Sequence, residues 1–524
     1  METPLTPLEF MRRTRKLHAN REGVVDGHRR WTYGEFFDRC DRWSSALQRL
    51  GVKRGDRVAY IAPNTHAQLE SFYAVPQLGA VLVPINFRLV AGDFQYLINH
   101  SGANVVCAGA DHIAAVESIR PELKHANHFI ALDGSSPQGW LSYESLLETA
   151  DGSFHRPEIG ERDLLTINYT SGTTSRPKGV MITHRNAWVN TVGMLAHWPM
   201  TPADTYLWTL PMFHANGWTF TWTVTAAGAR HICLPKFDGP TVFRIAGEEQ
   251  VTRLCAAPTV LIMLASAPAE AKALAPRGVG VMTAGAPPAA VTIQRIEEDL
   301  GWSVIQIYGL TETAPAISIC EPRPEHAAGN RDARAKIKAR QGVELMTSGE
   351  LRVVDDKGRD VPADGATPGE IVARGNVVMA GYYNDPEATE RCMGDGWFHT
   401  GDAAVVHPDG YVQITDRLKD VIISGGENIS SVEVEATLLR HDAIQEVAVV
   451  GFPHEKWGET PHAFIVFKAG QSASDAALRE FCRANMAHFK VPHAFTPIKE
   501  LPKTATGKIQ KFVLRQGRAN ISPQ

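Results

Sequence analysis

The 524-residue sequence contains few cysteines, and they form no pattern that builds a disulfide framework or binds zinc. Their number is odd, they are widely spread, and no two are separated by only two residues. These features exclude a small disulfide-stapled domain and favour a reducing compartment. The seven are Cys40, Cys107, Cys233, Cys255, Cys320, Cys392 and Cys482.

The sequence also lacks a long hydrophobic run. No stretch of about 18 uncharged apolar residues occurs, so a membrane-spanning helix is not expected. The N-terminus carries an early acid, Glu2, without the apolar core of a secretory signal, and residues 521–524 are no peroxisomal address. We therefore expect a cytoplasmic protein.

The sequence also has no large excess of charge of either sign. The net charge is −4 and the sequence pI is about 6.6, with acids and bases interspersed. No basic field is present to hold nucleic acid or an anionic membrane, so neither partner is expected. The expected partners are small molecules, and the sequence leaves open whether the chain forms a homo-oligomer.

A chain of this length divides into several domains, because one compact core does not grow so large. From about residue 30 to 345, short β-branched runs alternate with helical stretches, which is typical of βαβ units and largely parallel sheets. The runs expected as strands are 57–61, 80–84, 104–107, 231–234, 279–282 and 304–307.

The pattern changes after residue 345. Residues 350–354 and 370–374, separated by a Gly/Pro/Asp-rich turn region, predict hairpin-like β structure. Further on, Ser430 and Glu433 predict a capping box that opens a helix ending near residue 440. Strands are expected near residues 446–451 and 463–467.

These patterns predict an α/β fold in two domains. The large N-terminal domain, 1–417, contains parallel-rich sheets and a small β subdomain at about 345–415. A small mobile α+β domain, 418–524, follows after a hinge at residues 416–420. Because open α/β sheets bind ligands at the carboxyl ends of their strands, the site is expected there.

A loop rich in hydroxyls and glycine follows the strand-like run 164–168. Residues 169–179 read Tyr-Thr-Ser-Gly-Thr-Thr-Ser-Arg-Pro-Lys-Gly. Small residues let backbone N–H groups converge on an anion, the hydroxyls add donors, and Lys178 adds positive charge. Pro177 and Gly179 stand where a Walker A loop needs glycine and the magnesium-binding Ser or Thr. Taken alone, the loop leaves two interpretations open, a polyphosphate site outside the P-loop ATPases and an ordinary surface connection.

Six further segments stand in a fixed order after this loop. They are Leu-Pro-Met-Phe-His (210–214), Thr-Ala-Gly-Ala-Pro (283–287), Tyr-Gly-Leu-Thr-Glu (308–312), Trp-Phe-His-Thr-Gly-Asp (397–402), Asp-Arg-Leu-Lys-Asp (416–420) and Pro-Lys-Thr-Ala-Thr-Gly-Lys (502–508). Through these motifs nearly the whole chain resembles the adenylate-forming superfamily of acyl-CoA synthetases, firefly-type luciferases and nonribosomal peptide adenylation domains. Residues 213–218, 283–288 and 423–431 are most similar to the short- and medium-chain fatty acyl-CoA ligase branch, which includes plant-type acyl-activating enzymes.

The resemblance implies an ATP-dependent acyl-CoA ligase. A carboxylate attacks ATP to give acyl-AMP and pyrophosphate, and the thiol of coenzyme A then takes the acyl group and releases AMP. Lys508 matches the lysine that bridges the substrate carboxylate and the phosphate. A positioned ammonium suits this role, because it reduces repulsion between two anions and stabilises the charge that builds on phosphoryl oxygens.

For the nucleotide, the resemblance implies an Mg²⁺ ion held by Thr170 and Glu312, with Thr311 at the α-phosphate. Magnesium prefers oxygen ligands and binds through one or two carboxylates plus phosphates. Tyr308 beside the small 285–287 turn forms a slot for adenine, and Asp402 accepts the ribose hydroxyls. The implied ATP-binding residues are Thr170, Ser171, Gly172, Thr173, Thr174, Lys178, Gly285, Ala286, Pro287, Tyr308, Gly309, Asp402 and Arg417.

For the acid and the thiol, the resemblance implies His214 as a gate of the acyl site, counted with Lys508, Thr311 and Glu312 among the catalytic residues. The aromatic neighbourhood of residues 216–222 favours small or medium acids, because large rings limit pocket depth. The expected pocket comprises His214, Asn216, Gly217, Trp218, Ala284, Gly309 and Ala314. Lys419 matches the pivot of the hinge. Gly425, Gly426 and Glu427 are implied to line the path of coenzyme A.

Two departures from the branch leave alternatives open. Ser175 replaces a glycine of the phosphate loop, and Ala314 lies where the branch commonly has an aromatic-glycine pattern. One alternative is adenylation of another acid, including nitrous acid, or delivery to a carrier-protein thiol or an amine. The other is a nucleotide-binding scaffold that has lost the chemistry.

Overall fold

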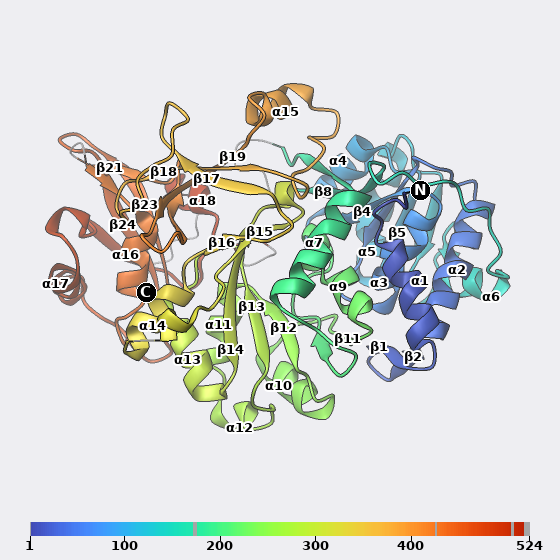
Figure 1. The fold of residues 1–524 in the computed structure, drawn as a ribbon, viewed down its shortest axis with the longest axis horizontal. Helices are drawn as coiled ribbons and strands as arrows, with labels where there is room; N and C mark the ends of the chain where they lie inside the picture. The colour runs from blue at the N-terminus through green and yellow to red at the C-terminus, as the bar shows by residue number, and fades with distance from the viewer. Residues whose placement is uncertain (1, 171–175, 328, 425–426, 505–507, 518–524) are drawn as a thin grey trace.

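A computed structural model describes residues 2–170, 176–327, 329–424, 427–504 and 508–517. The chain forms the α/β architecture that its sequence predicts, with two large sheets, a small β subdomain and a C-terminal α+β domain (Figure 1). In the described part of the chain no helix combines the length and apolar character that a bilayer span requires.

The first large sheet has seven strands and is parallel except for its last pair. Its order is β7 (Leu141–Ser142), β6 (His128–Ala131), β5 (Val105–Ala108), β3 (Arg57–Ile61), β4 (Val81–Ile85), β8 (Leu164–Tyr169) and β9 (Gly179–Thr183). Apolar residues of α4 (Ala91–Ser101) and α5 (Ala110–Ile119) pack on its outer face. Strand β8 lies beside the antiparallel β9, so the phosphate loop joins the two strands of a hairpin.

The second large sheet has nine strands, of which the central six are parallel. Its order is β16 (Val343–Glu344), β15 (Ala316–Ile319), β14 (Ser303–Gly309), β13 (Gly280–Thr283), β12 (Arg253–Ala256), β10 (Thr205–Leu207), β11 (Arg230–Cys233), β1 (Glu22–Asp26) and β2 (Arg29–Thr32). Its outer face is covered by α10 (Gly239–Glu248), α11 (Pro258–Ala265) and α13 (Ala290–Leu300).

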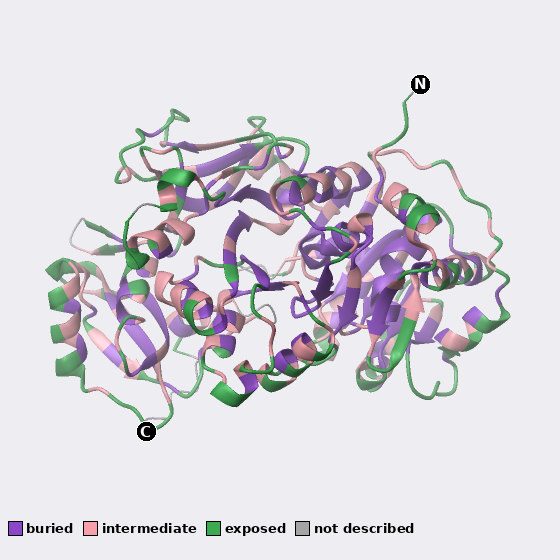
Figure 2. Cartoon of the chain, turned by 60° about the horizontal axis from the view of Figure 1, so that its bottom comes forward, coloured by how far each residue is buried: buried purple, intermediate pink, exposed green. Residues whose placement is uncertain are grey.

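The largest core cluster lies between these two sheets. Four helices are packed there, and their buried residues form one cluster with residues of both sheets. Figure 2 shows buried residues, in purple, along the interior strands and helices. The four helices are α2 (Tyr33–Arg49), α3 (His66–Gln77), α7 (His184–His197) and α9 (Phe220–Ala227). The arrangement gives five layers and places the carboxyl ends of β8, β13 and β14 near the centre of the molecule. The remaining helices of this part are α1 (Leu8–His18), α6 (Tyr143–Thr149), α12 (Ala269–Lys272) and α14 (Arg331–Lys338).

The β subdomain is an antiparallel sheet, as its hairpin pattern predicts. Its strands are β17 (Glu350–Val354), β18 (Gly369–Arg374), β19 (Phe398–Val406) and β20 (Val412–Arg417), with α15 (Pro386–Met393) between β18 and β19. Strand β20 ends at Arg417, so this sheet leads directly into the expected hinge.

The C-terminal domain is built on the long antiparallel pair of β23 (Ile444–His454) and β24 (Gly458–Phe467). The remaining elements are β21 (Ile422–Ser424), β22 (Glu427–Ile429), β25 (Ala494–Pro497), α16 (Ser431–Leu438), α17 (Asp475–Asn485) and α18 (Lys511–Arg515). Ser430 caps α16 by accepting from the Glu433 N–H at 3.1 Å. The Glu433 carboxylate pairs with Lys490 Nζ at 2.7 Å, so the predicted capping box is only half formed.

Candidate functional site

The phosphate loop is closed at its base by the β8–β9 hairpin. Tyr169 pairs with Gly179, and the Thr170 N–H donates to the Lys178 carbonyl at 3.0 Å. This bond brings the two ends of the loop together and places Thr170 opposite Lys178. The predicted ligands Ser171, Gly172, Thr173 and Thr174, and the departure Ser175, lie outside the described residues.

Tyr382 links the loop lysine to the predicted metal ligand. The Lys178 Nζ lies 4.7 Å from the centroid of the Tyr382 ring, and the Tyr382 hydroxyl donates to Glu312 Oε1 at 2.8 Å. A cation over an aromatic face is attracted by the ring quadrupole. Burial, followed by the Glu312 charge, raises the Tyr382 pKa, so the phenol remains a donor at neutral pH. Tyr382, which stands in the Gly-Tyr-Tyr run at 381–383, was not predicted as a site residue from the sequence.

Glu312 and Thr311 lie in η2 (Thr311–Thr313), immediately after β14. The chain reverses there because β14 pairs antiparallel with β15, and Gly309 faces Ala316. A Cβ on Gly309 would lie 1.7 Å from the Pro315 carbonyl oxygen, so only glycine allows this approach. Both Thr311 and Glu312 are partly exposed, as ligand-binding groups need to be.

Asp402 is the centre of a second polar cluster. Its Oδ1 pairs with Arg417 Nε at 2.6 Å, and its Oδ2 accepts from the Tyr308 hydroxyl at 2.7 Å. Asp402 and Arg417 face each other on β19 and β20, while Tyr308 comes from β14. The carboxylate is only 3% exposed, but a carboxylate has about four acceptor positions, so two remain for hydroxyl donors.

The small turn expected beside adenine follows β13 on the neighbouring strand. Thr283 pairs with Gln306, so the residues that follow each strand lie side by side, with Tyr308 next to the turn. Gly285 has a φ of 91°, which favours glycine, and Gly285 and Ala286 are exposed. Pro287 is partly exposed and Ala284 is buried.

Lys508 reaches this cluster from the C-terminal domain. Burial, and then the nearby Arg417, lowers the pKa of Lys508 to about 8. Burial, and then Lys508, lowers the pKa of His214 to about 4. Asp402 and Lys419 also act electrostatically on Lys508. Lys508 therefore lies within electrostatic range of Arg417 and Asp402 and of His214, which come from two other segments of the chain.

The segment after His214 has an unusual backbone. Ala215, Asn216, Gly217, Trp218 and Thr219 all have positive φ, between 36° and 65°, and form a left-handed turn that includes α8 (Ala215–Trp218). This conformation costs roughly 1–2 kcal/mol for each non-glycine residue. A Cβ on Gly217 would lie 2.5 Å from the Trp208 ring, so the turn is also closely packed.

The hinge region is tied to the C-terminal domain by hydrogen bonds. Asp416 Oδ2 accepts from the Ser431 N–H at 2.7 Å and from its hydroxyl at 2.6 Å. The Ser430 hydroxyl donates to the Thr415 carbonyl. Lys419 is exposed, and Asp420 pairs with Arg515 of α18 at 2.7 Å. Ser431 was not recognised from the sequence, although it stands in the same Ser-Ser pair as the helix cap.

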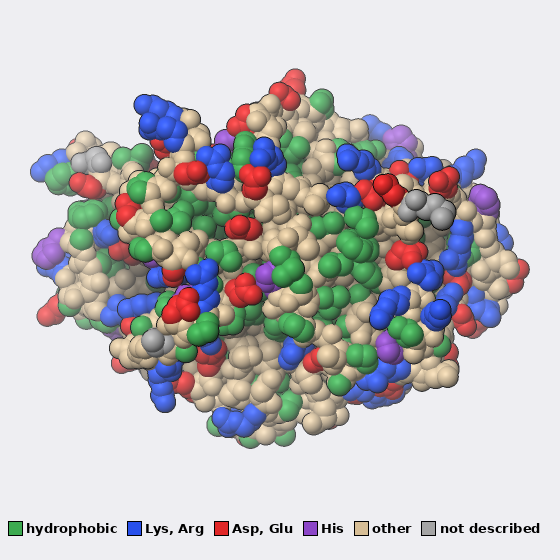
Figure 3. Space-filling model, viewed as in Figure 1, with side chains coloured by type: hydrophobic (Ala, Val, Ile, Leu, Met, Phe, Trp, Pro, Cys, Tyr) green, Lys and Arg blue, Asp and Glu red, His purple; other side chains and the backbone are tan. Residues whose placement is uncertain are grey.

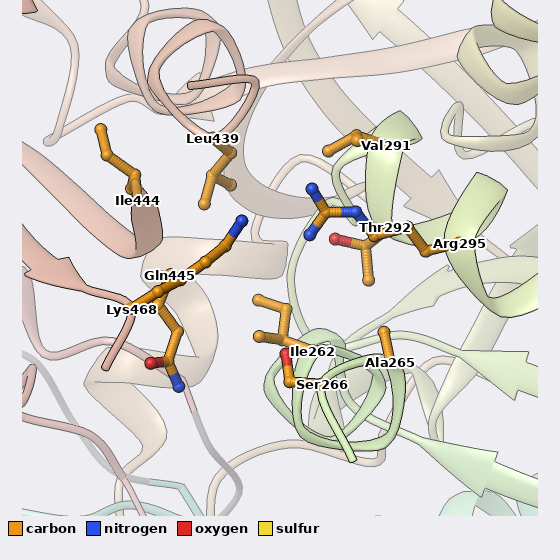
Figure 4. A pocket seen from close by; sticks show the side chains of 10 residues that line it. All are labelled: Ile262, Ala265, Ser266, Val291, Thr292, Arg295, Leu439, Ile444, Gln445 and Lys468. Carbon is orange, nitrogen blue, oxygen red and sulfur yellow. The ribbon is translucent and has the colours of Figure 1, made fainter. Parts of the chain in front are cut away.

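Of the three residues predicted for coenzyme A, the structure describes only Glu427. Gly425 and Gly426 lie outside the described residues, and Glu427 is exposed on β22. Throughout the described ranges, Glu427 makes no side-chain hydrogen bond or ion pair with the Asp402 or Lys508 groups. A small cleft of about 20 Å³ lies elsewhere between the domains, where Thr292 and Arg295 of α13 face Leu439 and Lys468 (Figure 4). None of the predicted site residues lines it.

The charges and donors match a nucleotide rather than a preformed metal cage. Across the described residues no group of three or more His, Cys, Asp or Glu side chains could hold a metal ion. On the face shown in Figure 3, acidic and basic side chains are interspersed, without a large field of one sign. An ion here would need ligands from its substrate as well as from Glu312.

The chain is similar to known proteins over nearly its whole length. The family model described as AMP-binding enzyme matches residues 11–383, and the model of the AMP-binding enzyme C-terminal domain matches residues 433–508. The chain is 44% identical to a probable acyl-activating enzyme 4 of Arabidopsis thaliana, over 98% of this chain and 97% of that protein. It is 42% identical to a 4-hydroxybutyrate–CoA ligase 2 of Metallosphaera sedula, over 98% and 94%. A solved anthranilate CoA ligase in complex with anthranoyl-AMP superimposes with a TM-score of 0.87 at 26% identity, covering 99% of both chains.

Proposed function

The chain belongs to the AMP-binding enzyme family, and we propose that it converts a small or medium carboxylic acid to its acyl-CoA. It is an ATP-dependent acyl-CoA ligase, an AMP-forming acid–thiol ligase that acts through an acyl-AMP. The observation that carries the residue assignment is the convergence of Lys508 with Asp402, Arg417 and His214. The scaffold, amine and carrier-protein alternatives are not favoured, because full-length relatives are named CoA ligases.

Lys508 acts in the first half-reaction. Its ammonium lies between the acid carboxylate and the α-phosphate, so it reduces their repulsion and stabilises the charge that builds on the phosphoryl oxygens. Thr311 donates to the α-phosphate. Lys178 and the 170–178 loop hold the outer phosphates, and the pyrophosphate leaves from there.

Thr170 and Glu312 are proposed to hold Mg²⁺. The partly exposed carboxylate of Glu312, oriented by the Tyr382 hydroxyl, is the kind of oxygen ligand that magnesium prefers. The position of Thr170 at the base of the phosphate loop supports the assignment. The ion supplies charge neutralisation on the phosphates when it is bound.

The adenosine is proposed to bind between Tyr308 and the turn 285–287, with Gly309 beneath it. The remaining acceptor positions of Asp402 receive the ribose hydroxyls, and Arg417 holds the carboxylate in place. This arrangement explains why an acid is retained where only 3% of it is exposed.

The acid is proposed to enter a pocket formed by His214, Asn216, Gly217, Trp218, Ala284, Gly309 and Ala314. Five of these, Asn216, Gly217, Trp218, Ala284 and Ala314, are buried, which favours a compact acid. His214 has a pKa of about 4, so the imidazole is neutral and does not compete with Lys508 for the carboxylate. A relative named for 4-hydroxybutyrate is consistent with a small substrate.

The second half-reaction is proposed to follow rotation of residues 418–524 about Lys419. The N-terminal domain, 1–417, with its β subdomain at about 345–415, stays with the adenylate. The hinge 416–420 then carries Gly425, Gly426 and Glu427 to the site, where coenzyme A enters. This rotation would have to break two contacts, the Ser431–Asp416 bonds and the Ser430–Thr415 bond.

The proposal is tested by pyrophosphate exchange into ATP with acetate, butyrate, 4-hydroxybutyrate, octanoate and benzoate, followed by CoA-dependent AMP release. We expect exchange with one or more small acids and acyl-CoA when coenzyme A is added. Exchange with none of these acids would contradict the assignment to small or medium acids. Acid-dependent AMP release without acyl-CoA would contradict coenzyme A as the acceptor.

We also propose a cytoplasmic location. All seven cysteines are free, which suits a reducing compartment. Imaging of a fluorescent fusion in its native cell should give a diffuse signal, and a punctate, peroxisome-like distribution would contradict the assignment.

A further inference from the structure

Three buried side chains form a closed ring of hydrogen bonds beside the left-handed turn. The Asn216 Nδ2 donates to Thr166 Oγ1 at 2.9 Å, and that hydroxyl donates to Asn168 Oδ1 at 2.7 Å. The Asn168 Nδ2 then returns to Asn216 Oδ1 at 3.1 Å. We call these three residues the amide ring. Their exposures are 0%, 2% and 1% for Thr166, Asn168 and Asn216, so water does not satisfy them.

The amide ring is attached on both sides of His214. Besides its bond to Asn216, the Asn168 amide donates to the Phe213 carbonyl at 3.1 Å. The residue before His214 and the residue two after it are therefore held by one side chain. The His214 carbonyl in turn accepts from the Gly217 N–H at 2.9 Å, which closes the turn.

The anchor of the ring is the strand that carries the phosphate loop. Thr166 and Asn168 are two residues apart on β8, so their side chains point to the same face, and β8 ends at Tyr169, directly before Thr170. One rigid strand thus fixes both the start of the phosphate loop and the segment that carries His214. Fully satisfied buried networks of this kind rigidify the groups that they join.

The turn needs such an anchor. Four of its five residues are not glycine, and each has a positive φ that L residues rarely adopt. Asparagine tolerates this region, but alanine, tryptophan and threonine do not favour it. Strained backbone of this kind persists only where its surroundings determine it, and the amide ring supplies bonds to the middle of the turn.

We infer that Thr166 and Asn168 are positioning residues that hold the left-handed turn, and with it His214 and the acyl wall, at a fixed place relative to the phosphate loop. The inference rests on the proposed acyl role of residues 214–218. It assigns acid selectivity in part to Thr166 and Asn168, which reach the proposed pocket only through their hydrogen bonds to Asn216 and Phe213.

The test compares Thr166→Val with Thr166→Ser by pyrophosphate exchange. Valine keeps the shape and removes the hydroxyl, whereas serine keeps the hydroxyl and restores the ring. We expect Thr166→Val to lower kcat/KM for the preferred acid on the order of 10- to 100-fold, as small misplacements of reacting groups do. In Thr166→Val the KM for ATP should stay within about twofold, and discrimination between acids of different length should shrink. Thr166→Ser should keep the wild-type kcat/KM for the acid and the wild-type discrimination.

Ser44→Ala provides the matched control. Ser44 is fully buried on α2, and its hydroxyl donates to the Cys40 and Ala74 carbonyls at 3.0 and 2.9 Å, far along the chain from the turn. The Ser44→Ala variant therefore loses buried hydrogen bonds but leaves the amide ring unchanged. If Thr166→Val shows the same acid selectivity as Ser44→Ala, the inference is overturned.

Thr166→Ala keeps the inference testable if Thr166→Val does not fold. Alanine removes the hydroxyl and both of its ring bonds at a residue outside the proposed acid pocket, without adding a second γ-methyl group. Loss of acid selectivity supports the ring, and wild-type selectivity overturns it. Absence of exchange by the wild-type enzyme with every carboxylic acid would instead overturn the proposed function, and the inference with it.

Discussion

The nucleotide half and the acyl half of the site are built in different ways. In the nucleotide half, charged and aromatic side chains such as Asp402, Arg417 and Tyr308 come from separate strands and contact one another directly. In the acyl half, the shape comes from a backbone turn with five positive φ angles, held by uncharged amides. Under the proposed assignment, charged side chains fix where ATP reacts, whereas backbone conformation fixes which acid reacts.

The largest expected effect is on the charge side. Lys508→Ala should lower the rate of pyrophosphate exchange by on the order of 10²-fold or more, because an electrostatic stabiliser of the transition state is lost. Thiolysis of supplied acyl-AMP by coenzyme A should change little. Lys499→Ala, an exposed lysine of the same domain, is the control and should be neutral. Equal loss in both half-reactions would contradict the assignment.

Gly217→Ala tests the backbone side. A Cβ there would meet the Trp208 ring at 2.5 Å in a left-handed conformation, so a loss of about 2–5 kcal/mol in unfolding free energy is expected from strain and overpacking together. The KM for the acid should rise more than the KM for ATP. Gly27→Ala, with φ +62° and open space, isolates the conformational cost. Equal losses in the two variants, measured by urea denaturation, would show that packing against Trp208 does not matter.

The pH dependence of kcat/KM should distinguish Lys508 from His214 of the acyl half. The pKa of Lys508 is lowered to about 8, so the ammonium is present below pH 8 and is lost as the pH rises through that value. We expect kcat/KM for ATP to fall about tenfold per pH unit above 8. His214, with a pKa of about 4, stays neutral and should give no acid limb between pH 5 and 7. Lys508→Arg should remove the alkaline limb; its persistence would point to another group.

A smaller effect is expected from Tyr382→Phe. The change keeps the ring over Lys178 but removes the bond to Glu312, so the KM for Mg·ATP should rise roughly 3- to 10-fold, in line with a partly exposed hydrogen bond to a charged acceptor. Initial rates at varied Mg²⁺ measure it. The neighbouring Tyr383→Phe is the control. An unchanged Mg²⁺ dependence would remove Tyr382 from the nucleotide half.

The smallest effect concerns the hinge. Ser431→Ala removes one of the two bonds from Ser431 to Asp416, so acyl-AMP formation should slow by about two- to fivefold while thiolysis is unchanged or faster. Single-turnover measurements of each half-reaction separate them. Ser474→Ala, at the cap of α17, loses a helix cap without touching the hinge. A parallel slowing of both half-reactions would argue for a general loss of stability instead.

The difference between the halves also explains what the sequence could predict. The strands at 57–61 and 350–354 were predicted with the bounds that the structure has, because alternation and turn residues mark them locally. The roles of Asp402 and Lys508 were predicted because both residues stand in motifs of the family that the chain resembles. Without that resemblance, a lysine in a polar segment such as Lys508 would be expected to be solvated.

The structure of the acyl half was harder to predict from the sequence, for physical reasons. Ala215 and Trp218 give no sign of positive φ, since nothing in their side chains favours it. Asn168 and Thr166 are ordinary polar residues in an apolar strand, and only the fold brings them to Asn216, about fifty residues away. Tyr382 was missed for the same reason, because its partners Glu312 and Lys178 come from two other segments.

The most direct test of the central claim follows the oxygen atoms of the acid. With a small acid labelled with ¹⁸O in its carboxylate, coenzyme A and ATP, attack on the α-phosphorus predicts one ¹⁸O in the AMP and unlabelled pyrophosphate. Formation of ADP with ¹⁸O in inorganic phosphate would show attack on the terminal phosphorus and contradict the account.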